Sequence, residues 1–383
     1  MSDISFSKRY VIPCLVQAFQ AVFLWAVLTY ITIYWIDLGF SHMQVGIFVS
    51  IFPLTSLALM IPFGLYVDRI SPKKLVIASQ FIFGLAIAGL MMSHDFWPTV
   101  FFLVIGGMGN SLFSNALPAL FYKTLGSEVR GFKLGIFTAT TLVGYGLGPL
   151  LAGYILQSFD MQAVFFFALS GVVPLITMSL FLADAPGTAV KLSDYKADLS
   201  NKSVLAFIIL VFFFSLHAGP EQTSFSLFLN KDIGLDKTGI GWIYFIHANF
   251  MALLSVINGF ISDRFNARGH GMAALFCTGI FISGITNISL FMATSFGTVL
   301  AARLSHAVGD SITLVTRSLI ISNLFATTRM GGNLGVLTTT ITLATLVGSI
   351  ISGALPGYVT GFIIVGVLAV LSIPAVMSTK PKF

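Results

Sequence analysis

Long apolar runs fill almost the whole of this 383-residue sequence and are separated by short polar turns. Only 9% of the residues are charged and 56% are hydrophobic, whereas a soluble domain carries about 25% charged residues. A surface with so little polarity cannot be covered by water, so the bilayer must be the solvent for most of it. Because a membrane-spanning helix needs ~20 mainly apolar residues, the runs predict about twelve spans.

The expected fold is an all-α membrane protein whose spans divide at one polar stretch. Residues 184–202 form this stretch, which is rich in Asp, Lys and Ser and joins the sixth span to the seventh. We expect a six-helix bundle at 1–183, a cytoplasmic linker at 184–202 and a second six-helix bundle at 203–383. The spans are expected at 10–36, 44–65, 74–93, 97–122, 132–158, 162–183, 203–229, 238–261, 271–293, 298–325, 332–355 and 357–377.

The basic residues are distributed unevenly between the loops. Most of the 20 Lys and Arg lie in the tails or in alternate loops, whereas the opposite loops hold only Lys231 and Lys237. This asymmetry follows the positive-inside rule and predicts that both termini are cytoplasmic. The pI of 9.3 therefore reports orientation and not a nucleic-acid partner. We expect a monomer surrounded by lipid, and the compact tails favour the inner (plasma) membrane of a bacterium.

A charged turn occurs twice, at an offset of 195 residues. The first copy follows the second expected span and runs Gly64-Leu-Tyr-Val-Asp68-Arg69-Ile-Ser-Pro-Lys73-Lys74. The second copy follows the eighth span and runs Gly259-Phe-Ile-Ser-Asp263-Arg264-Phe-Asn-Ala-Arg268. The same offset pairs Gly39 with Gly234. Since each repeat holds six spans, the two copies have the same orientation across the membrane, so the repeat is of the parallel type.

The acids of these turns are candidates for a gate. A carboxylate at the cytoplasmic end of a span can face the positive N-terminal end of a neighbouring helix, and spans begin near Gly332 and Phe132 on that side. A contact that forms in one conformation and breaks in another would act as a latch. Alternatively, the basic residues only fix the topology of the loops. The predicted gating residues are Gly64, Asp68, Arg69, Lys73, Lys74, Gly259, Asp263, Arg264 and Arg268.

The fifth span contains small residues at four-residue spacing together with a proline. Small residues let helices approach closely in lipid, and a proline frees a backbone carbonyl and bends a helix. The predicted packing motif comprises Gly144, Gly148, Pro149 and Gly153. Ordinary close packing explains such a motif as well as a functional role does.

The first charged turn resembles the loop signature of the major facilitator superfamily, and the fifth span resembles that superfamily's antiporter motif. Ser71-Pro72 departs from the usual continuation of the loop signature. The resemblance covers essentially the whole chain. It implies two six-helix bundles with a solute site near the midplane, and transport of a small molecule. The resemblance to the antiporter motif favours export.

Ionisable residues at membrane depth are few, and four of them lie in the tenth span. At ~100° per residue these four fall within about 60° of arc on one helix face. An ionised side chain at mid-bilayer costs at least ~2.5–3.5 kcal/mol, so this face must meet a cavity or other charged groups. The four residues are Arg303, His306, Asp310 and Arg317.

The seventh span supplies another acid at membrane depth, Glu221, and His217 lies four residues before it on the same face. Gly219-Pro220 should loosen the helix beside them, as in the broken helices of transporter sites. These two side chains alone are too few to predict a metal site, and none is predicted.

Desolvation favours the neutral form of a buried carboxylate, whereas a nearby cation favours its ionised form. A site that gains and loses such a neighbour can take up a proton on one side of the membrane and release it on the other. We therefore expect protons as the coupling ion, carried through Glu221, Asp310, His217 and His306. The substrate cavity is expected to be lined by Arg303, Arg317, Gln17, Gln20, Asn110, Ser114, Gln222 and Asn249.

The sequence contains no nucleophile elbow, phosphate loop or paired zinc motif, so we expect neither an enzyme nor a cofactor. The leading interpretation is a secondary active transporter that moves a small organic solute by alternating access. Proton coupling is expected, and export is favoured on the antiporter-like motif alone. One alternative is a proton-coupled uptake symporter for a small organic anion or zwitterion. An alternative of another class is a non-transporting membrane receptor on the same fold.

Overall fold

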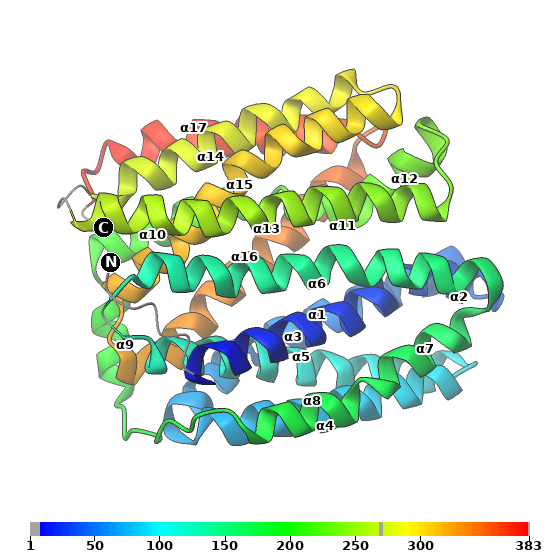
Figure 1. The fold of residues 1–383 in the computed structure, drawn as a ribbon. Helices are drawn as coiled ribbons and strands as arrows, with labels where there is room; N and C mark the ends of the chain where they lie inside the picture. Colours follow the sequence, from blue (N-terminus) through cyan, green and yellow to red (C-terminus); the bar gives the residue numbers. More distant parts are fainter. Residues whose placement is uncertain (1–7, 127, 268–270, 382–383) are drawn as a thin grey trace. The chain divides into compact units, whose positions relative to one another are not determined.

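The computed structural model describes residues 8–126, 128–267 and 271–381, and all regular structure within these ranges is helical (Figure 1). The chain forms two compact units. Unit 1 comprises Met1–Gly126, Val143–Val190 and Thr327–Thr338. Unit 2 comprises Ser127–Leu142, Lys191–Ala326 and Thr339–Phe383.

Most helices belong wholly to one unit. Unit 1 holds α1 (Lys8–Leu28), α2 (Ile31–Asp37), α3 (His42–Arg69), α4 (Pro72–Met92), α5 (Phe96–Thr124), α7 (Met161–Ser170) and α8 (Val172–Leu180). Unit 2 holds α9 (Leu192–Leu199), α10 (Lys202–Ser215), α11 (Ala218–Thr223), α12 (Phe225–Leu227), α13 (Lys237–Ala267), α14 (Met272–Ile288), α15 (Phe296–Leu324) and α17 (Thr360–Met377).

Two long helices are divided between the units. The first part of α6 (Arg130–Ser158) belongs to unit 2 and the rest to unit 1. The first part of α16 (Met330–Ala354) belongs to unit 1 and the rest to unit 2. These beginnings are the helix ends that the two repeated acids were expected to face. The boundaries of the units therefore depart from those of the expected halves at these two helices.

The duplication is visible in the packing inside each unit. In unit 1, α5 packs against α3 and α4, and α4 also packs against α8. In unit 2, α15 packs against α13 and α14, and α14 also packs against α17. Gly39 and Gly234, which the offset of 195 pairs, both adopt a positive φ, of 89° and 79°. Glycine adopts this conformation without steric cost, which explains its presence at both turns.

Eleven helices in the described part of the chain are long and apolar enough to span a membrane. One further helix, α15, is 29 residues long and is less apolar, because it carries the predicted stripe of ionisable residues. With α15 as the twelfth span, the expected architecture of twelve transmembrane helices is confirmed. Large apolar side chains such as Trp97 and Val173 are exposed, as expected where lipid is the solvent.

Two of the expected spans are interrupted beside prolines. The sixth span divides into α7 and α8 at Gly171, because Pro174 has no N–H to donate to the carbonyl of Ser170. The seventh span breaks at Leu216 and His217, between α10 and α11. Here Pro220 cannot donate to the carbonyl of Leu216, and we call these two residues the helix break.

Glycines let helices approach closely at matching places in the two units. In unit 1, a Cβ on Gly144 or Gly148 of α6 would overlap the backbone of α1. In unit 2, a Cβ on Gly348 of α16 would overlap the carbonyl oxygen of Leu216. The carbonyl oxygen of Pro149 accepts a hydrogen bond from the hydroxyl of Tyr30 at 3.1 Å. Gly153, the last glycine of the motif, is buried.

Gly348→Ala should lower the melting temperature of the detergent-purified protein by several degrees, because overpacking costs roughly 1–3 kcal/mol. Gly353→Ala on the same helix is the matched control, since a Cβ there meets nothing within 4 Å. We expect the control to melt at or above the temperature of the unmodified protein. Equal melting of the two variants in a thermal unfolding assay would contradict close packing at Gly348.

Candidate functional site

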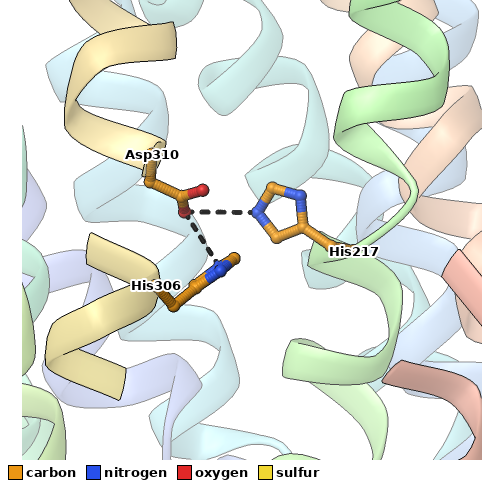
Figure 2. A group of neighbouring side chains, drawn as sticks. All are labelled: His217, His306 and Asp310. Atoms are coloured by element: carbon orange, nitrogen blue, oxygen red, sulfur yellow. Dashed lines mark ion pairs between the residues drawn. The ribbon is translucent and has the colours of Figure 1, made fainter. Parts of the chain in front are cut away.

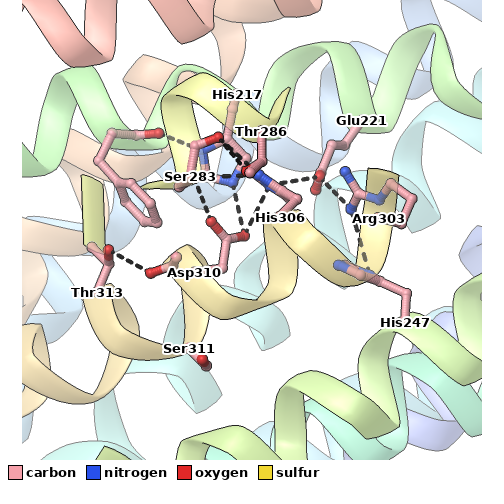
Figure 3. A network of polar contacts seen from close by, with 12 residues as sticks. His217, Glu221, His247, Ser283, Thr286, Arg303, His306, Asp310, Ser311 and Thr313 are labelled. Atoms are coloured by element: carbon pink, nitrogen blue, oxygen red, sulfur yellow. Dashed lines mark hydrogen bonds and ion pairs between the residues drawn. The ribbon is translucent and has the colours of Figure 1, made fainter. Parts of the chain in front are cut away.

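Buried ionisable side chains gather at one place inside unit 2 (Figure 3). They come from the helix break and α11 (His217 and Glu221), from α13 (His247) and from α15. The members on α15 are Arg303, His306 and Asp310, which are only 3%, 1% and 5% exposed. We call these six residues the charged cluster.

One half of the charged cluster is built around a guanidinium. Arg303 Nη2 lies 2.5 Å from Glu221 Oε1 and 3.5 Å from His247 Nδ1. The guanidinium also lies over the ring of Phe225, 4.9 Å from its centroid. Because an arginine is always charged, Glu221 serves here as its counter-ion.

The other half is built around Asp310 (Figure 2). One carboxylate oxygen, Oδ2, lies 3.4 Å from His217 Nε2 and 3.2 Å from His306 Nε2. The other oxygen accepts a hydrogen bond from the hydroxyl of Ser283 on α14 at 2.6 Å. His306 Nε2 also lies 3.7 Å from Glu221 Oε1, which joins the two halves.

The spacing of this second half is also that of a possible metal site. One ligand atom each from His217, His306 and Asp310 lies within 4.8 Å of the other two. One arginine and two carboxylates leave the charged cluster with a net charge of −1 when the imidazoles are neutral, so one proton brings it to neutrality.

The structure brings together five of the predicted residues: Glu221, Asp310, His217, His306 and Arg303. Arg317 lies seven residues beyond Asp310 on α15 and is half-buried. Gln222 on α11 is exposed. Asn249 on α13 donates to the carbonyl of Phe245 in its own helix at 2.8 Å.

The remaining residues predicted to line a cavity lie in unit 1. Gln20 and Asn110 line a small, mainly apolar cavity with Phe52, Phe83 and Leu103. Asn110 donates to the hydroxyl of Ser56 at 3.3 Å. Gln17 and Ser114 are half-buried on α1 and α5.

Asp68 is fully buried at the end of α3 and accepts from two successive amides at the beginning of α16. Gly331 N lies 2.9 Å from Oδ1, and Gly332 N lies 2.7 Å from Oδ2. The positive end of the helix dipole favours a carboxylate at this position. Lys123 at the end of α5 adds an ion pair, with Nζ 3.0 Å from Oδ1. A Cβ on Gly64 would lie 2.5 Å from the carbonyl oxygen of Gly331, so the backbones are in close contact.

Asp263 makes the same type of contact inside unit 2. Its carboxylate accepts from Gly131 N at 2.7 Å and from Phe132 N at 2.9 Å, at the beginning of α6. Gly259 lies against the carbonyl of Gly131, where a Cβ would be 2.5 Å from the oxygen. The basic residues of the turns lie mainly at the surface: Arg69, Lys74 and Arg264 are exposed and Lys73 is half-buried. Arg268 lies outside the described residues.

Three contributors to these sites were not predicted from the sequence. Nothing in the sequence around Ser283 distinguishes it from other serines in helices. Its hydrogen bond to Asp310 depends on the packing of α14 against α15. His247 lies on α13 and contacts Arg303 of α15. The side chain of Lys123 at the end of α5 is 7% exposed and pairs with Asp68. A lysine that directly follows an apolar span is the sequence signal that could have indicated such a partner, because a lysine is almost never buried unless it is paired.

The sequence matches the Major Facilitator Superfamily model over residues 14–225 and 204–382, so the chain belongs to this superfamily. It is 25% identical over 342 residues to an uncharacterized MFS-type transporter of Methanocaldococcus jannaschii, which covers 84% of each chain. It is 24% identical over 255 residues to the multidrug resistance protein MdtH of Salmonella typhi, a match that covers 64% of this chain and 62% of that protein. The human organic anion transporter MFSD10 has the same fold, with a TM-score of 0.76 at 15% identity over 96% of this chain and 99% of that one.

These findings define the class. The chain is an integral, multi-pass membrane protein and a secondary transporter, not an enzyme.

The pair formed by Arg303 and Glu221 predicts strongly non-additive stability effects. Arg303→Gln should destabilise the purified protein, because removing one partner leaves a buried charge uncompensated, at a cost of roughly 3–5 kcal/mol. Glu221→Gln should also destabilise it, and the double variant should be more stable than the sum of the two losses predicts. Thermal unfolding of all four proteins gives the coupling energy. Additive losses would show that the two charges do not interact.

Proposed function

We propose that this chain is a proton-coupled secondary transporter that works by alternating access. The charged cluster carries the proposal. Its net charge of −1 with neutral imidazoles lies at membrane depth, where an uncompensated charge costs at least ~2.5–3.5 kcal/mol. Binding one proton removes that cost, and losing the proton restores it. Conformations that expose the cluster to opposite sides of the membrane would thus exchange this proton with different solutions.

Asp68 and Asp263 are proposed as the two latches of the transport cycle. Each carboxylate holds the beginning of a helix that continues into the other unit. Breaking such a latch releases two charge-assisted hydrogen bonds and separates a pair of closely packed glycines. We propose that both latches lie on the cytoplasmic side, as do both termini, because the basic residues concentrate there.

Export of a small organic solute is the favoured direction. The support is the glycine–proline motif of α6 and the similarity to a protein named for multidrug resistance. The alternative is uptake of a small organic anion or zwitterion together with protons. It is favoured by Arg303, which would become available to an anionic group if Glu221 were protonated. The chain is proposed to act as a monomer in a bacterial inner membrane.

Proton coupling is tested on purified protein in proteoliposomes, with a solute first selected by a thermal-shift screen. The unmodified protein should accumulate or expel the solute in response to a pH gradient, and Asp310→Asn should abolish that response. Asp37→Asn is the control, because Asp37 is an exposed acid. Flux that ignores the pH gradient in the unmodified protein would refute proton coupling. A complete absence of flux for every solute that binds would favour the receptor interpretation.

The latches are tested by replacing each aspartate with asparagine, which removes the charge and keeps the shape of the side chain. Asp68→Asn and Asp263→Asn should each lower solute flux by at least about tenfold, since Asn carries no charge and offers one acceptor oxygen where the carboxylate offers two. Asp160→Asn is the matched control, because Asp160 also caps a helix, α7, but lies exposed and accepts only from its own turn. Unchanged flux in both latch variants would contradict a gating role.

A further inference from the structure

Both imidazole rings that face Asp310 are oriented by backbone carbonyls. His217 Nδ1 contacts the carbonyl oxygen of Phe214, and His306 Nδ1 lies 3.0 Å from the carbonyl oxygen of Ser283. A carbonyl oxygen only accepts hydrogen bonds, so Nδ1 carries the hydrogen in each ring. A neutral imidazole has one N–H, and Nε2 of each ring is therefore a bare acceptor until the ring is protonated.

These two bare acceptors face a third acceptor. Oδ2 of Asp310 lies between His217 Nε2 and His306 Nε2, at 3.4 Å and 3.2 Å (Figure 2). Ser283 occupies the other oxygen of the carboxylate, which fixes its orientation. Without an added proton both nitrogen–oxygen contacts bring lone pairs together and are repulsive. One proton, on either ring or on Oδ2, converts a contact into a strong hydrogen bond.

The surrounding charges allow one such proton and oppose a second. Glu221 from α11 is neutralised by Arg303 from α15, and α13 contributes His247 and Tyr244 on the side of Arg303. From α14 the uncharged Ser283 faces Asp310 (Figure 3). A second proton would leave a net positive charge beside the permanent charge of Arg303.

The position of His217 connects this proton to the backbone. His217 belongs to the helix break, whereas His306 and Asp310 lie one turn apart on α15. Because Pro220 removes a helical hydrogen bond at the break, contacts with other helices hold this segment in place, among them the close packing of Leu216 against Gly348 and the contact of His217 with Asp310. The contact between His217 and Asp310, which is an ion pair when the imidazole is protonated, joins this segment to α15.

We propose that His217 is the positioning residue through which the protonation of Asp310 and the two imidazoles controls α11. The inference rests on the proposed function and deepens it by naming the element that moves. With the proton bound, the helix break is clamped to α15. When the proton leaves, the contact becomes repulsive and α11 is released together with Glu221, the counter-ion of Arg303.

Hydrogen–deuterium exchange of the purified protein tests the clamp without a substrate. Proton binding stabilises the clamped state, so protection is present at low pH and is lost as pH rises. After correction for the intrinsic pH dependence of exchange, amides of residues 216–223 should exchange at least about tenfold faster at about pH 10 than at about pH 7.

Two variants should each make exchange independent of pH, one by keeping it fast and the other by keeping it slow. His217→Phe keeps a ring but has no nitrogen, so residues 216–223 should exchange fast at both pH values. Asp310→Asn supplies an amide donor toward Nε2 without needing a proton, so they should exchange slowly at both. His94→Phe is the control at an exposed histidine and should keep the pH dependence of the unmodified protein.

The outcomes separate this inference from the proposed function. A pH-independent exchange rate in the unmodified protein, or unchanged pH dependence in His217→Phe, overturns the clamp even when a pH gradient drives solute flux. Fast exchange in Asp310→Asn also overturns it, which keeps the inference testable if His217→Phe does not fold. A pH-dependent clamp without gradient-driven flux would sustain the inference and refute proton-coupled transport.

Discussion

The contact of one Asp310 oxygen with two imidazole nitrogens is the interaction on which the account of this transporter depends. It places an acid inside a span, where lipid offers no hydrogen bonds, and surrounds it with groups that need a proton to become mutually attractive. The same polar residues lower the hydropathy of α15 below that of every other span. The cost of inserting this helix is offset by partners from α11, α13 and α14, which pair its charges.

The duplication separates two kinds of residue. Asp68 and Asp263 recur at matching positions, and each accepts hydrogen bonds from two amides at the beginning of a helix. The repeat therefore preserves this contact at a helix end. The charged cluster does not recur, because Val22 and Ala26 stand where the second half has His217 and Glu221. The ion pair of Lys123 with Asp68 adds a further contact to the latch of unit 1. The charged cluster, which only the second half contains, is therefore a better guide to function than the helix-end contacts that both halves share.

Much of the fold could be predicted from the sequence because its signals are local. Apolar length sets the number of spans, and the spacing of Arg303, His306 and Asp310 sets one helix face. The partners of that face could not be predicted, since periodicity does not say which helix lies opposite. Ser283 and His247 could not be predicted for this reason. Arg317 was predicted to line the cavity only because it lies on the same helix face as Asp310. The division of α6 and α16 between two units also depends on tertiary contacts that no local pattern encodes.

The central claim, that the charged cluster exchanges a single proton during transport, can be measured directly. A pH-indicator dye in weakly buffered detergent solution reports protons released or taken up when a transported solute binds to the purified protein. We expect a change of about one proton per protein, and none when Asp310 is replaced by Asn. A binding event that changes no proton in the unmodified protein, or the same proton change in the Asp310→Asn variant, would contradict it.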